Sequence, residues 1–362
     1  AFDRVSHKKL LLKPNSYGIT GDLYGWIKSF LSNRTQAVKL DGCLSSVIAI
    51  LSGVPQGSVL GPILFVLFIN DLVDCFKNLA VSTKLFADDL KLYTSYGLTD
   101  SSCDLTEALH RVTVWAKKWQ LTINSTKCNV LRIVNPRCKN KSDIVYDLNG
   151  SSLKVLSVVK DLGVAGDKNL RFDNHISSVV HKSLQRANLI LKCFQSRDRS
   201  LLMKAFKVYV RPLLEYATPV WSPHFMHLIL KIEHVRRSFT KRLFGLKNVT
   251  YIDRLKQLEI DTLEHRRLIY DLCTCFKIIH GYNDTCLDMN RMHLEERPNN
   301  TRGHNLKLAK EMCRTDMLRF FFCNRICTVW NSLPLDVVNA PSVNSFKKRV
   351  SKFNLDRFLT LK

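Results

Sequence analysis

The chain has 362 residues, of which 46% are apolar and only 14 are Gly and 10 are Pro, a composition that excludes a disordered, collagen-like or low-complexity protein. Lys and Arg outnumber Asp and Glu by 55 to 31, so the net charge of +24 makes a polyanion the first partner to consider and a membrane surface the second. The longest apolar run, Ile63 to Ile69, is too short to cross a bilayer, which takes roughly 20 residues.

The first fifty residues predict a short helix followed by paired strands. Asp3 is expected to be the N-cap of a helix over residues 4–13, which ends before Pro14. Residues 35–40 and 47–51 are strand-like, and Asp41-Gly42 between them is a turn signal. The chain begins with Ala rather than Met, inside what is described below as a motif, so we expect a fragment of a longer protein.

Residues 55–168 continue the mixture of helices and strands. A tight turn at 55–57 leads into an apolar helix over 59–71, and two β-like runs, 83–87 and 90–94, flank Asp88-Asp89 as a hairpin with a two-residue turn. Apolar residues at helical intervals predict an amphipathic helix over 104–120, and 130–134 and 153–159 are strand-like.

From about residue 173 the pattern becomes wholly helical. Helices are expected over 175–194 and 201–216, with further helices to about residue 280, and no internal repeat is evident. The order is therefore mixed α and β first, and all α afterwards.

Twelve Cys raise the question of disulfides or zinc. No CxxC pair occurs, and the nearest approach to a metal cluster is Cys273, Cys275, His280 and Cys286, whose first spacing of one residue is unusual for a zinc site. The favoured interpretation is reduced thiols packed as small hydrophobes, Cys193 among them, in an intracellular protein.

The charge is uneven along the chain. Residues 51–100 carry −2, whereas residues 151–250 carry +12, half of the total. This segment contains pairs of basic residues that lie among aromatic residues. The pairs are Arg236-Arg237 and Lys241-Arg242. A solvated helix face is one interpretation of this pattern, and phosphate binding with release of counterions is the other.

Asp88 and Asp89 are the sharpest chemical feature. A solvated surface turn is the ordinary explanation for two Asp at a hairpin, and a magnesium site is the alternative, because Mg²⁺ prefers hard oxygen ligands and completes its shell with substrate phosphates. A Pro-Gln-Gly turn lies 32 residues upstream, with Gln56 and Gly57 at its centre. Such a turn before a helix lets backbone approach a flat substrate closely, and the two elements together are much more specific than either alone.

These segments resemble the reverse transcriptase of non-LTR (LINE-type) retrotransposons, closest to the jockey-like group. The resemblance covers nearly the whole chain. It is carried by Ala1 to His7, Gly18-Ile19, Trp26 to Leu31, Arg34 to Gln36, Ser52 to Pro62, Ile69 to Leu72, Phe86 to Asp89, Trp119 to Lys127, Lys160 to Val164 and Trp330 to Pro334.

The resemblance implies roles for individual residues. Asp88 and Asp89 match the family's metal-binding catalytic pair, and Lys127 matches the lysine thought to protonate the leaving pyrophosphate. Phe2 matches the aromatic residue that packs under the nucleotide sugar. Gln56 and Gly57 match residues that line the incoming nucleotide and the template. For Lys127 an exposed lysine without a role remains the alternative.

One departure from the family pattern concerns the start of the chain. The family's first catalytic carboxylate lies four residues before the Ala-Phe-Asp segment, which here opens the chain, and the fingers are missing as well. We therefore expect this polypeptide alone to be inactive. The alternative to a working polymerase is a catalytically dead retroelement remnant that at most binds nucleic acid.

The resemblance also implies an architecture. The fold class is α+β: a partial right-hand polymerase palm, an antiparallel sheet with helices, over residues 1–168, a basic helical thumb over 169–250, and a helical C-terminal region over 251–362. The implied activity is RNA-directed DNA synthesis with two Mg²⁺ ions, an RNA template, a DNA primer and dNTPs, and no membrane. The intact protein is expected in the nucleus and cytoplasm.

Overall fold

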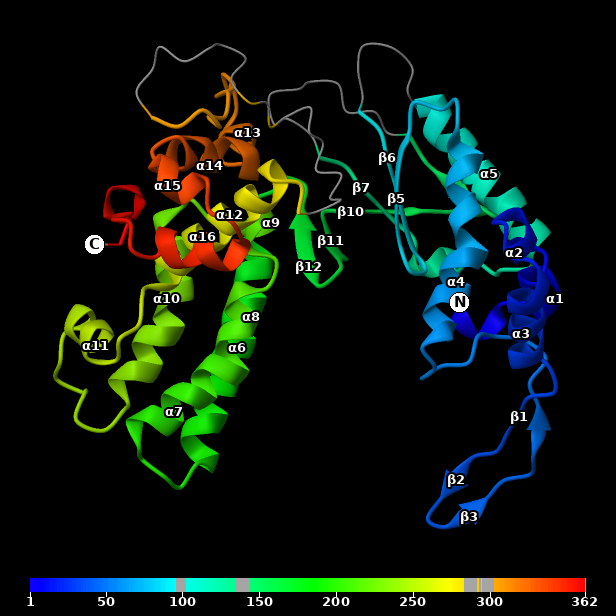
Figure 1. Cartoon of the computed structure of the whole chain (residues 1–362), viewed down its shortest axis with the longest axis horizontal. Helices are drawn as coiled ribbons and strands as arrows, with labels where there is room; N and C mark the ends of the chain where they lie inside the picture. The colour runs from blue at the N-terminus through cyan, green and yellow to red at the C-terminus, as the bar shows by residue number, and fades with distance from the viewer. Residues whose placement is uncertain (96–101, 134–143, 283–291, 293, 295–302, 362) are drawn as a thin grey trace. The chain divides into compact units, whose positions relative to one another are not determined.

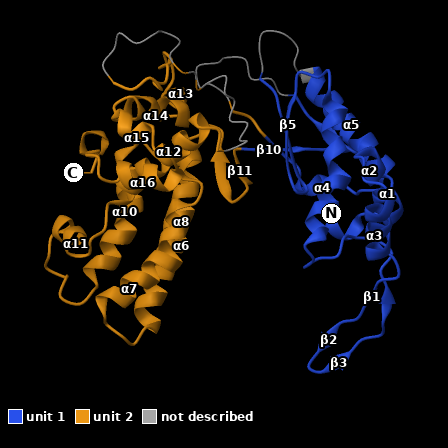
Figure 2. Cartoon of the chain, viewed as in Figure 1, with its two compact units in different colours: residues 1–130, 138–156 blue, residues 131–137, 157–362 orange. Residues whose placement is uncertain are grey.

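The computed structural model describes residues 1–95, 102–133, 144–282, 292, 294 and 303–361. The chain divides into two compact units (Figure 2), unit 1 with residues 1–130 and 138–156, and unit 2 with residues 131–137 and 157–362. The three parts predicted from the sequence are functional assignments, and they remain predictions. Each unit is described by itself below.

Unit 1 combines helices with short antiparallel pairings (Figure 1). Its helices are α1 (His7–Leu10), α2 (Lys13–Ser16), α3 (Gly21–Leu31), α4 (Leu60–Ile69) and α5 (Ser102–Trp119), with 3₁₀ turns η1 (Phe2–Arg4), η2 (Asn70–Phe76) and η3 (Ser125–Lys127). Its strands are β1 (Thr35–Gln36), β2 (Lys39–Leu40), β3 (Cys43–Leu44), β4 (Ile48–Ala49), β5 (Ser82–Phe86), β6 (Asp89–Tyr93), β7 (Asn129–Leu131), β8 (Asp147–Leu148), β9 (Ser151–Ser152) and β10 (Lys154–Leu156).

The strands of unit 1 pair two by two. β1 pairs with β4 and β2 with β3, both antiparallel, around the turn Asp41-Gly42 that the sequence predicted. Both turn residues have positive φ, 47° and 86°, which Asp and Gly tolerate better than most residues. β5 pairs antiparallel with β6, and β8 with β9. The mixed helix and strand character expected from the sequence is confirmed, with small antiparallel sheets.

The core of unit 1 forms around α4, which corresponds to the apolar helix predicted over residues 59–71. Leu64, Phe65 and Phe68 are almost completely buried. α5 packs against them through Val112 and Trp115, which lie one helical turn apart on its apolar face. Burial of each large apolar side chain stabilises the fold by about 1.5–3 kcal/mol.

One charged side chain lies inside this core. Lys13 is 3% exposed and forms an ion pair with Asp71, while its Nζ lies 3.4 Å from the centroid of the Trp119 ring. Trp115 Nε1 also donates to Asp71, at 3.1 Å. Burial lowers the pKa of Lys13, although Asp71 opposes that shift. Removal of the Asp71 carboxylate would leave the buried Lys13 ammonium without its ionic partner.

Unit 2 is mainly helical after one hairpin. The hairpin is β11 (Val158–Asp161) with β12 (Val164–Asp167), antiparallel. The helices are α6 (Asp173–Cys193), α7 (Arg199–Ala205), a π-helical turn (Phe206–Val210), α8 (Arg211–Glu215), α9 (Thr218–Trp221), α10 (Met226–Lys241), α11 (Tyr251–Gln257), α12 (Leu263–Ile279), α13 (Asp316–Arg319), α14 (Phe322–Trp330), α15 (Leu335–Val338) and α16 (Val343–Val350), with a 3₁₀ turn at Asp356–Phe358.

Two apolar clusters hold unit 2 together. One is centred on α6, α8 and α10, and includes Trp221 and Phe239; the other joins α12, α14 and α16, and includes Trp330. The second cluster contains four buried cysteines, which agree with the predicted packing of thiols as small hydrophobes: Cys273, Cys275, Cys323 and Cys327. Cys43, Cys103 and Cys193 are exposed instead, so the prediction holds for part of the cysteines, and Cys286 lies outside the described residues. Over the part of the chain that the structure describes, the helices are too short or too polar to span a bilayer.

Candidate functional site

The first seven residues of unit 1 pair with the segment that precedes the Pro-Gln-Gly turn. Val54 N donates to Phe2 O at 3.0 Å and Gly53 N donates to Val5 O at 2.8 Å. Gly53 has φ +91°, and a Cβ at this position would lie 2.9 Å from the Cα of Asp3. Glycine is therefore required for this close approach of the two backbones.

Asp3 has a different role from the one that the sequence predicted. It lies inside the 3₁₀ turn η1, and Ser6 is the residue that caps α1. The predicted N-cap was wrong, and so was the helix expected over residues 4–13. Within that range α1 is the only complete helix, and Pro14, the expected end, lies in the first turn of α2. The carboxylate of Asp3 accepts a hydrogen bond from Gln56 Nε2 at 2.6 Å instead.

The contact between Asp3 and Gln56 was missed from the sequence. These residues are 53 positions apart, and neither local spacing nor composition indicates that they meet. The short pairing of residues 1–7 with 52–54 brings them together. The two predicted nucleotide-binding residues Phe2 and Gln56 thus lie on segments joined directly by hydrogen bonds.

Phe2 is half-buried against α4. Its ring stacks on Phe65 with centroids 4.0 Å apart and an interplanar angle of 18°. Because Phe65 is completely buried, it forms a rigid base for the Phe2 ring. This geometry holds Phe2 in one place while part of its surface stays accessible.

The Pro-Gln-Gly turn is closed by Ser58. Its hydroxyl donates to Pro55 O at 2.7 Å and accepts from Gly61 N at 3.0 Å, which satisfies an amide at the start of α4. Gln56 and Gly57 are exposed. Gly57 has φ +79° and open space where a side chain would be, so a ligand has room to approach the backbone there.

Asp88 and Asp89 lie on the β5–β6 hairpin, as predicted, but the turn is one residue earlier. Phe86 pairs with Asp89, so the two turn residues are Ala87 and Asp88, and Asp89 is the first residue of β6. Ala87 has φ +51°, a conformation that costs a non-glycine residue about 1–2 kcal/mol. Backbone strain of this kind is frequent at functional sites, where it holds a side chain in a defined orientation.

The two carboxylates are exposed, whereas the hairpin below them is anchored. Leu85 and Leu90 are half-buried and pack on the same apolar cluster as Phe65. Phe2 packs on that cluster too. The hairpin therefore packs on the same core as the two paired segments that contain Phe2 and Gln56. Among the described residues, no hydrogen bond joins Asp88 or Asp89 to Asp3 or Gln56.

The donor set fits a divalent cation. Adjacent carboxylates supply the hard oxygen ligands that Mg²⁺ prefers. In the ranges covered by the structure, no group of three or more His, Cys, Asp and Glu could hold a metal ion. Asp88 and Asp89 would thus supply part of a coordination shell, and water or phosphate oxygens would supply the rest, as is common for Mg²⁺.

Lys127 is exposed at the end of the 3₁₀ turn η3. Asn124 caps this turn by accepting from Thr126 N at 3.1 Å. Thr122, two residues before Asn124, accepts a hydrogen bond from Arg4 at 3.2 Å, which ties this region to the start of the chain. No contact between Lys127 and Asp88 or Asp89 is present among the described residues, so its role as a proton donor stays a prediction.

The predicted nucleic-acid-binding residues divide into two classes. Arg236 is 2% exposed, and its guanidinium donates to the carbonyl oxygen of Asp261, so it lies inside unit 2 rather than on its surface. Arg237, Lys241 and Arg242 are exposed on and just after α10. The mispredicted position of Arg236 follows from helical spacing: Ile232, Val235 and Phe239 are buried, and residue 236 lies on the same face of the helix.

Comparison with known proteins shows what this chain is similar to. Residues 1–164 match the family model for reverse transcriptase (RNA-dependent DNA polymerase). An RNA-directed DNA polymerase from the mobile element jockey of Drosophila funebris is 33% identical over 272 residues, which are 72% of this chain and 29% of that protein.

Two further relatives agree. A probable RNA-directed DNA polymerase from transposon BS of Drosophila melanogaster is 31% identical over 239 residues, 61% of this chain and 25% of that protein. A Pol polyprotein from the retrotransposable element R2 of Popillia japonica is 25% identical over 178 residues, 46% of this chain and 28% of that protein. The chain spans less than a third of the length of each of these relatives. Residues 1–164 of this chain are therefore similar to reverse transcriptases.

Proposed function

We propose that the chain is the part of an RNA-directed DNA polymerase of a non-LTR retrotransposon that carries two of its metal-binding carboxylates. The observation that carries the proposal is the strained hairpin turn that presents Asp88 and Asp89 in a segment similar to reverse transcriptases. The names of the jockey and BS relatives support RNA-templated DNA synthesis as the reaction.

In this proposal residues 1–168 form a palm, 169–250 a basic thumb, and 251–362 a helical C-terminal region. Asp88 and Asp89 would hold divalent cations, two Mg²⁺ ions in the complete site, which supply positive charge at the reacting phosphates. The protein would act on an RNA template and a DNA primer in the nucleus and cytoplasm.

The chain's own residues would position the nucleotide. Phe2, held flat on Phe65, would pack under the sugar. The amide of Gln56 is fixed by Asp3, and Gly57 leaves its backbone open to the nucleotide and template. Lys127 would donate a proton to the leaving pyrophosphate.

The test is to graft residues 1–362 in place of the matching segment of the Drosophila funebris jockey polymerase and to measure dNTP incorporation on an RNA template with Mg²⁺. We expect Asp88→Asn to lower incorporation by about 100-fold or more, because charge stabilisation in the transition state is lost. Asp74→Asn is the matched control, since Asp74 is an exposed carboxylate that pairs with the surface residue Lys77.

Retained incorporation in the Asp88→Asn graft would contradict the assignment of the metal site. An inactive unmutated graft that still binds an RNA–DNA hybrid would favour the alternative, a catalytically dead remnant that at most binds nucleic acid.

A further inference from the structure

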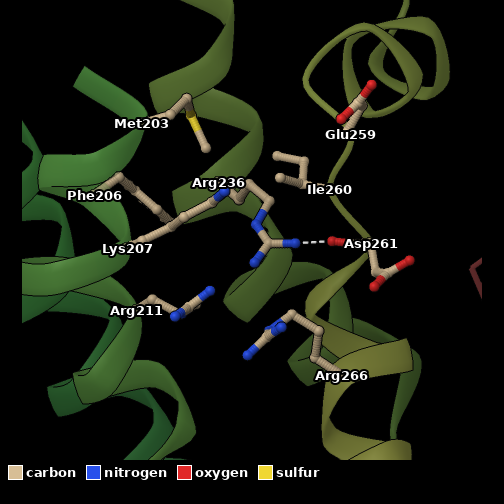
Figure 3. A pocket seen from close by; sticks show the side chains of 9 residues that line it. All are labelled: Met203, Phe206, Lys207, Arg211, Arg236, Glu259, Ile260, Asp261 and Arg266. Atoms are coloured by element: carbon tan, nitrogen blue, oxygen red, sulfur yellow. Dashed lines mark hydrogen bonds between the residues drawn. The ribbon is translucent and has the colours of Figure 1, made fainter. Parts of the chain in front are cut away.

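Unit 2 contains a polar cavity of about 90 Å³ that the polymerase proposal does not use (Figure 3). Its lining comes from the helical run α7–α8, from α10, from the segment between α11 and α12, and from α12 itself: Met203, Phe206, Lys207, Arg211, Arg236, Glu259, Ile260, Asp261 and Arg266. A single water needs about 10–15 Å³ by this measure, so the space is large enough for several waters or a small anion.

Four cationic side chains point toward one another around this cavity. Figure 3 shows Lys207, Arg211, Arg236 and Arg266 converging, while the carboxylates of Glu259 and Asp261 lie away from them. The carboxylate of Asp261 is 3.3 Å from His265 Nδ1. His265 is the main cause of the lowered pKa of Asp261, and Arg266 and Arg236 also contribute to it, so the acidic residues of the lining offset only part of the positive charge.

Two further acids, Glu215 and Glu233, compensate part of this positive charge. Glu215 holds Arg266 through two hydrogen bonds, of 2.5 and 3.0 Å, and lies 3.7 Å from Arg211, so one carboxylate serves two guanidinium groups. Glu233, one turn before Arg236 on α10, accepts from Tyr251 and from Leu263 N. The structure gives no acidic partner for Lys207 among the described residues.

Arg236 provides the observation that points to a ligand. It is 2% exposed, and one end of its guanidinium donates to Asp261 O, but its buried Nε has no hydrogen-bond partner within the described residues. A buried donor without a partner costs about 1–3 kcal/mol, and more when it is charged. An anion in the cavity would remove that cost.

The helix itself is distorted where it meets the cavity. Residues Phe206–Val210 form a π turn, in which Arg211 N is bonded to Phe206 O. Pro212 follows and has no amide hydrogen for the carbonyl of Val208, which accounts for the departure from α geometry. Such π turns are frequent at functional sites, and this one carries Lys207 and leads into Arg211.

We propose that this cavity binds a phosphate group, held by Lys207, Arg211, Arg236 and Arg266. Guanidinium groups match phosphate oxygens in charge and in geometry, and Lys207 adds a point charge. The phosphate comes either from the backbone of a bound nucleic acid or from free phosphate or pyrophosphate. This proposal does not depend on polymerase activity, since its evidence lies wholly in unit 2.

Lys207→Ala is the variant of choice, because no residue that the structure describes gives this half-exposed side chain an acidic partner, whereas replacing Arg236 would disturb the core. Binding of inorganic phosphate and pyrophosphate to the full chain is measured by calorimetry against chloride at equal ionic strength. We expect affinity to fall at least tenfold in Lys207→Ala and to be restored in Lys207→Arg. Lys204→Ala, one turn away, exposed and not part of the lining, is the matched control and is expected to bind as the unmutated chain does.

A salt series with an RNA–DNA hybrid duplex distinguishes the two sources. If the phosphate belongs to the backbone, Lys207→Ala reduces the log–log salt slope by about 0.9 relative to Lys204→Ala. If the slope is unchanged while phosphate or pyrophosphate binding is lost, the ligand is the free anion. The proposal is overturned if neither assay separates Lys207→Ala from Lys204→Ala.

Discussion

Gly53 decides whether the start of the chain can lie beside the Pro-Gln-Gly turn. Its φ of +91° and the 2.9 Å that would separate a Cβ from Asp3 Cα are two independent reasons for glycine. Gly57 shares only the first reason, since its φ is +79° but nothing lies within 4 Å of the place where a side chain would begin. A comparison of substitutions at the two glycines therefore distinguishes the cost of a positive φ from the cost of close packing.

We predict that Gly53→Ala destabilises unit 1 by about 2 kcal/mol more than Gly57→Ala. Both variants force alanine into the left-handed region, but only the first pushes the backbones apart and breaks the hydrogen bonds Gly53 N to Val5 O and Val54 N to Phe2 O, each worth about 1 kcal/mol. Urea unfolding, followed by hydrogen exchange of peptides from residues 1–156, measures the difference. Equal destabilisation by both variants would show that the close approach at Gly53 contributes nothing.

At the scale of elements, the start of α6 is fixed by the hairpin before it. The carboxylate of Asp167, the last residue of β12, accepts from Phe172 N at 2.6 Å and from Asn169 N at 2.9 Å. In the first turn of α6, His175 Nδ1 accepts from Ala165 N at 3.3 Å, so the ring is neutral. His175 is buried, with its edge against Trp221, and this burial lowers its pKa.

The lowered pKa of His175 predicts a loss of stability in acid. The unfolded chain takes up a proton near pH 6.5 while the folded chain does not, so the stability of unit 2 falls as the pH drops from about 6.5 toward the folded pKa. We expect His175→Gln to make the loss of stability between pH 7 and pH 5 smaller.

Urea unfolding at a series of pH values, followed through peptides from residues 157–193, is the measurement. Part of the pH dependence is expected to remain, because burial also lowers the pKa of His224 and His304. His234→Gln, an exposed histidine of α10, is the control. If both substitutions leave the same pH dependence, the assignment to His175 fails.

The elements that could be predicted are those with a repeating pattern. Periodicity predicted α5 over 104–120 and α6 over 175–194, and the structure has them within two residues at each end. The β5–β6 turn was misplaced by one residue because Ala87 adopts a positive φ, a conformation that sequence rules reserve for Gly, Asn and Asp. The pairing of residues 1–7 with 52–54 is too short to produce a periodic pattern of apolar residues in the sequence.

The same distinction holds for the candidate site. The hairpin carboxylates and the Pro-Gln-Gly turn could be found because their chemistry is contained in a few consecutive residues. The bond between Asp3 and Gln56, the burial of Arg236 and the convergence of Lys207 with Arg266 depend on contacts between distant segments. Those contacts are set by packing, which one sequence does not reveal.

At the scale of the whole molecule, the distribution of charge distinguishes a binding surface from a merely basic protein. Residues 151–250 hold +12 of the net +24. Arg237, Lys241 and Arg242 lie close together in this segment and are exposed. The guanidinium group of Arg237 lies 4.8 Å from the centroid of the Tyr251 ring, and Arg242 donates to Asn188 at 2.5 Å. These contacts restrict the positions of both guanidinium groups.

We predict that the chain binds an RNA–DNA hybrid duplex with little sequence preference and with affinity that falls steeply as salt rises. Neutralised phosphates release counterions, with a log–log slope of about −0.9 per phosphate on duplex DNA, and backbone contacts do not identify bases. Reversing Arg237, Lys241 and Arg242 to Glu should flatten this slope by about 2 to 3. Arg236 is left unchanged, because reversing a buried charge would unfold the unit rather than test its surface.

The control is an equal charge reversal elsewhere, at exposed Lys8, Lys28 and Lys39 of unit 1. Both triple variants change the net charge by the same amount, so an effect of overall charge alone would alter the two salt slopes equally. If the surface around α10 contacts the duplex, the slope flattens more in the variant of residues 237, 241 and 242, and the difference reports the phosphates contacted there. If the two variants titrate alike, or if binding is absent at low salt, residues 169–250 do not form the proposed nucleic-acid-binding thumb.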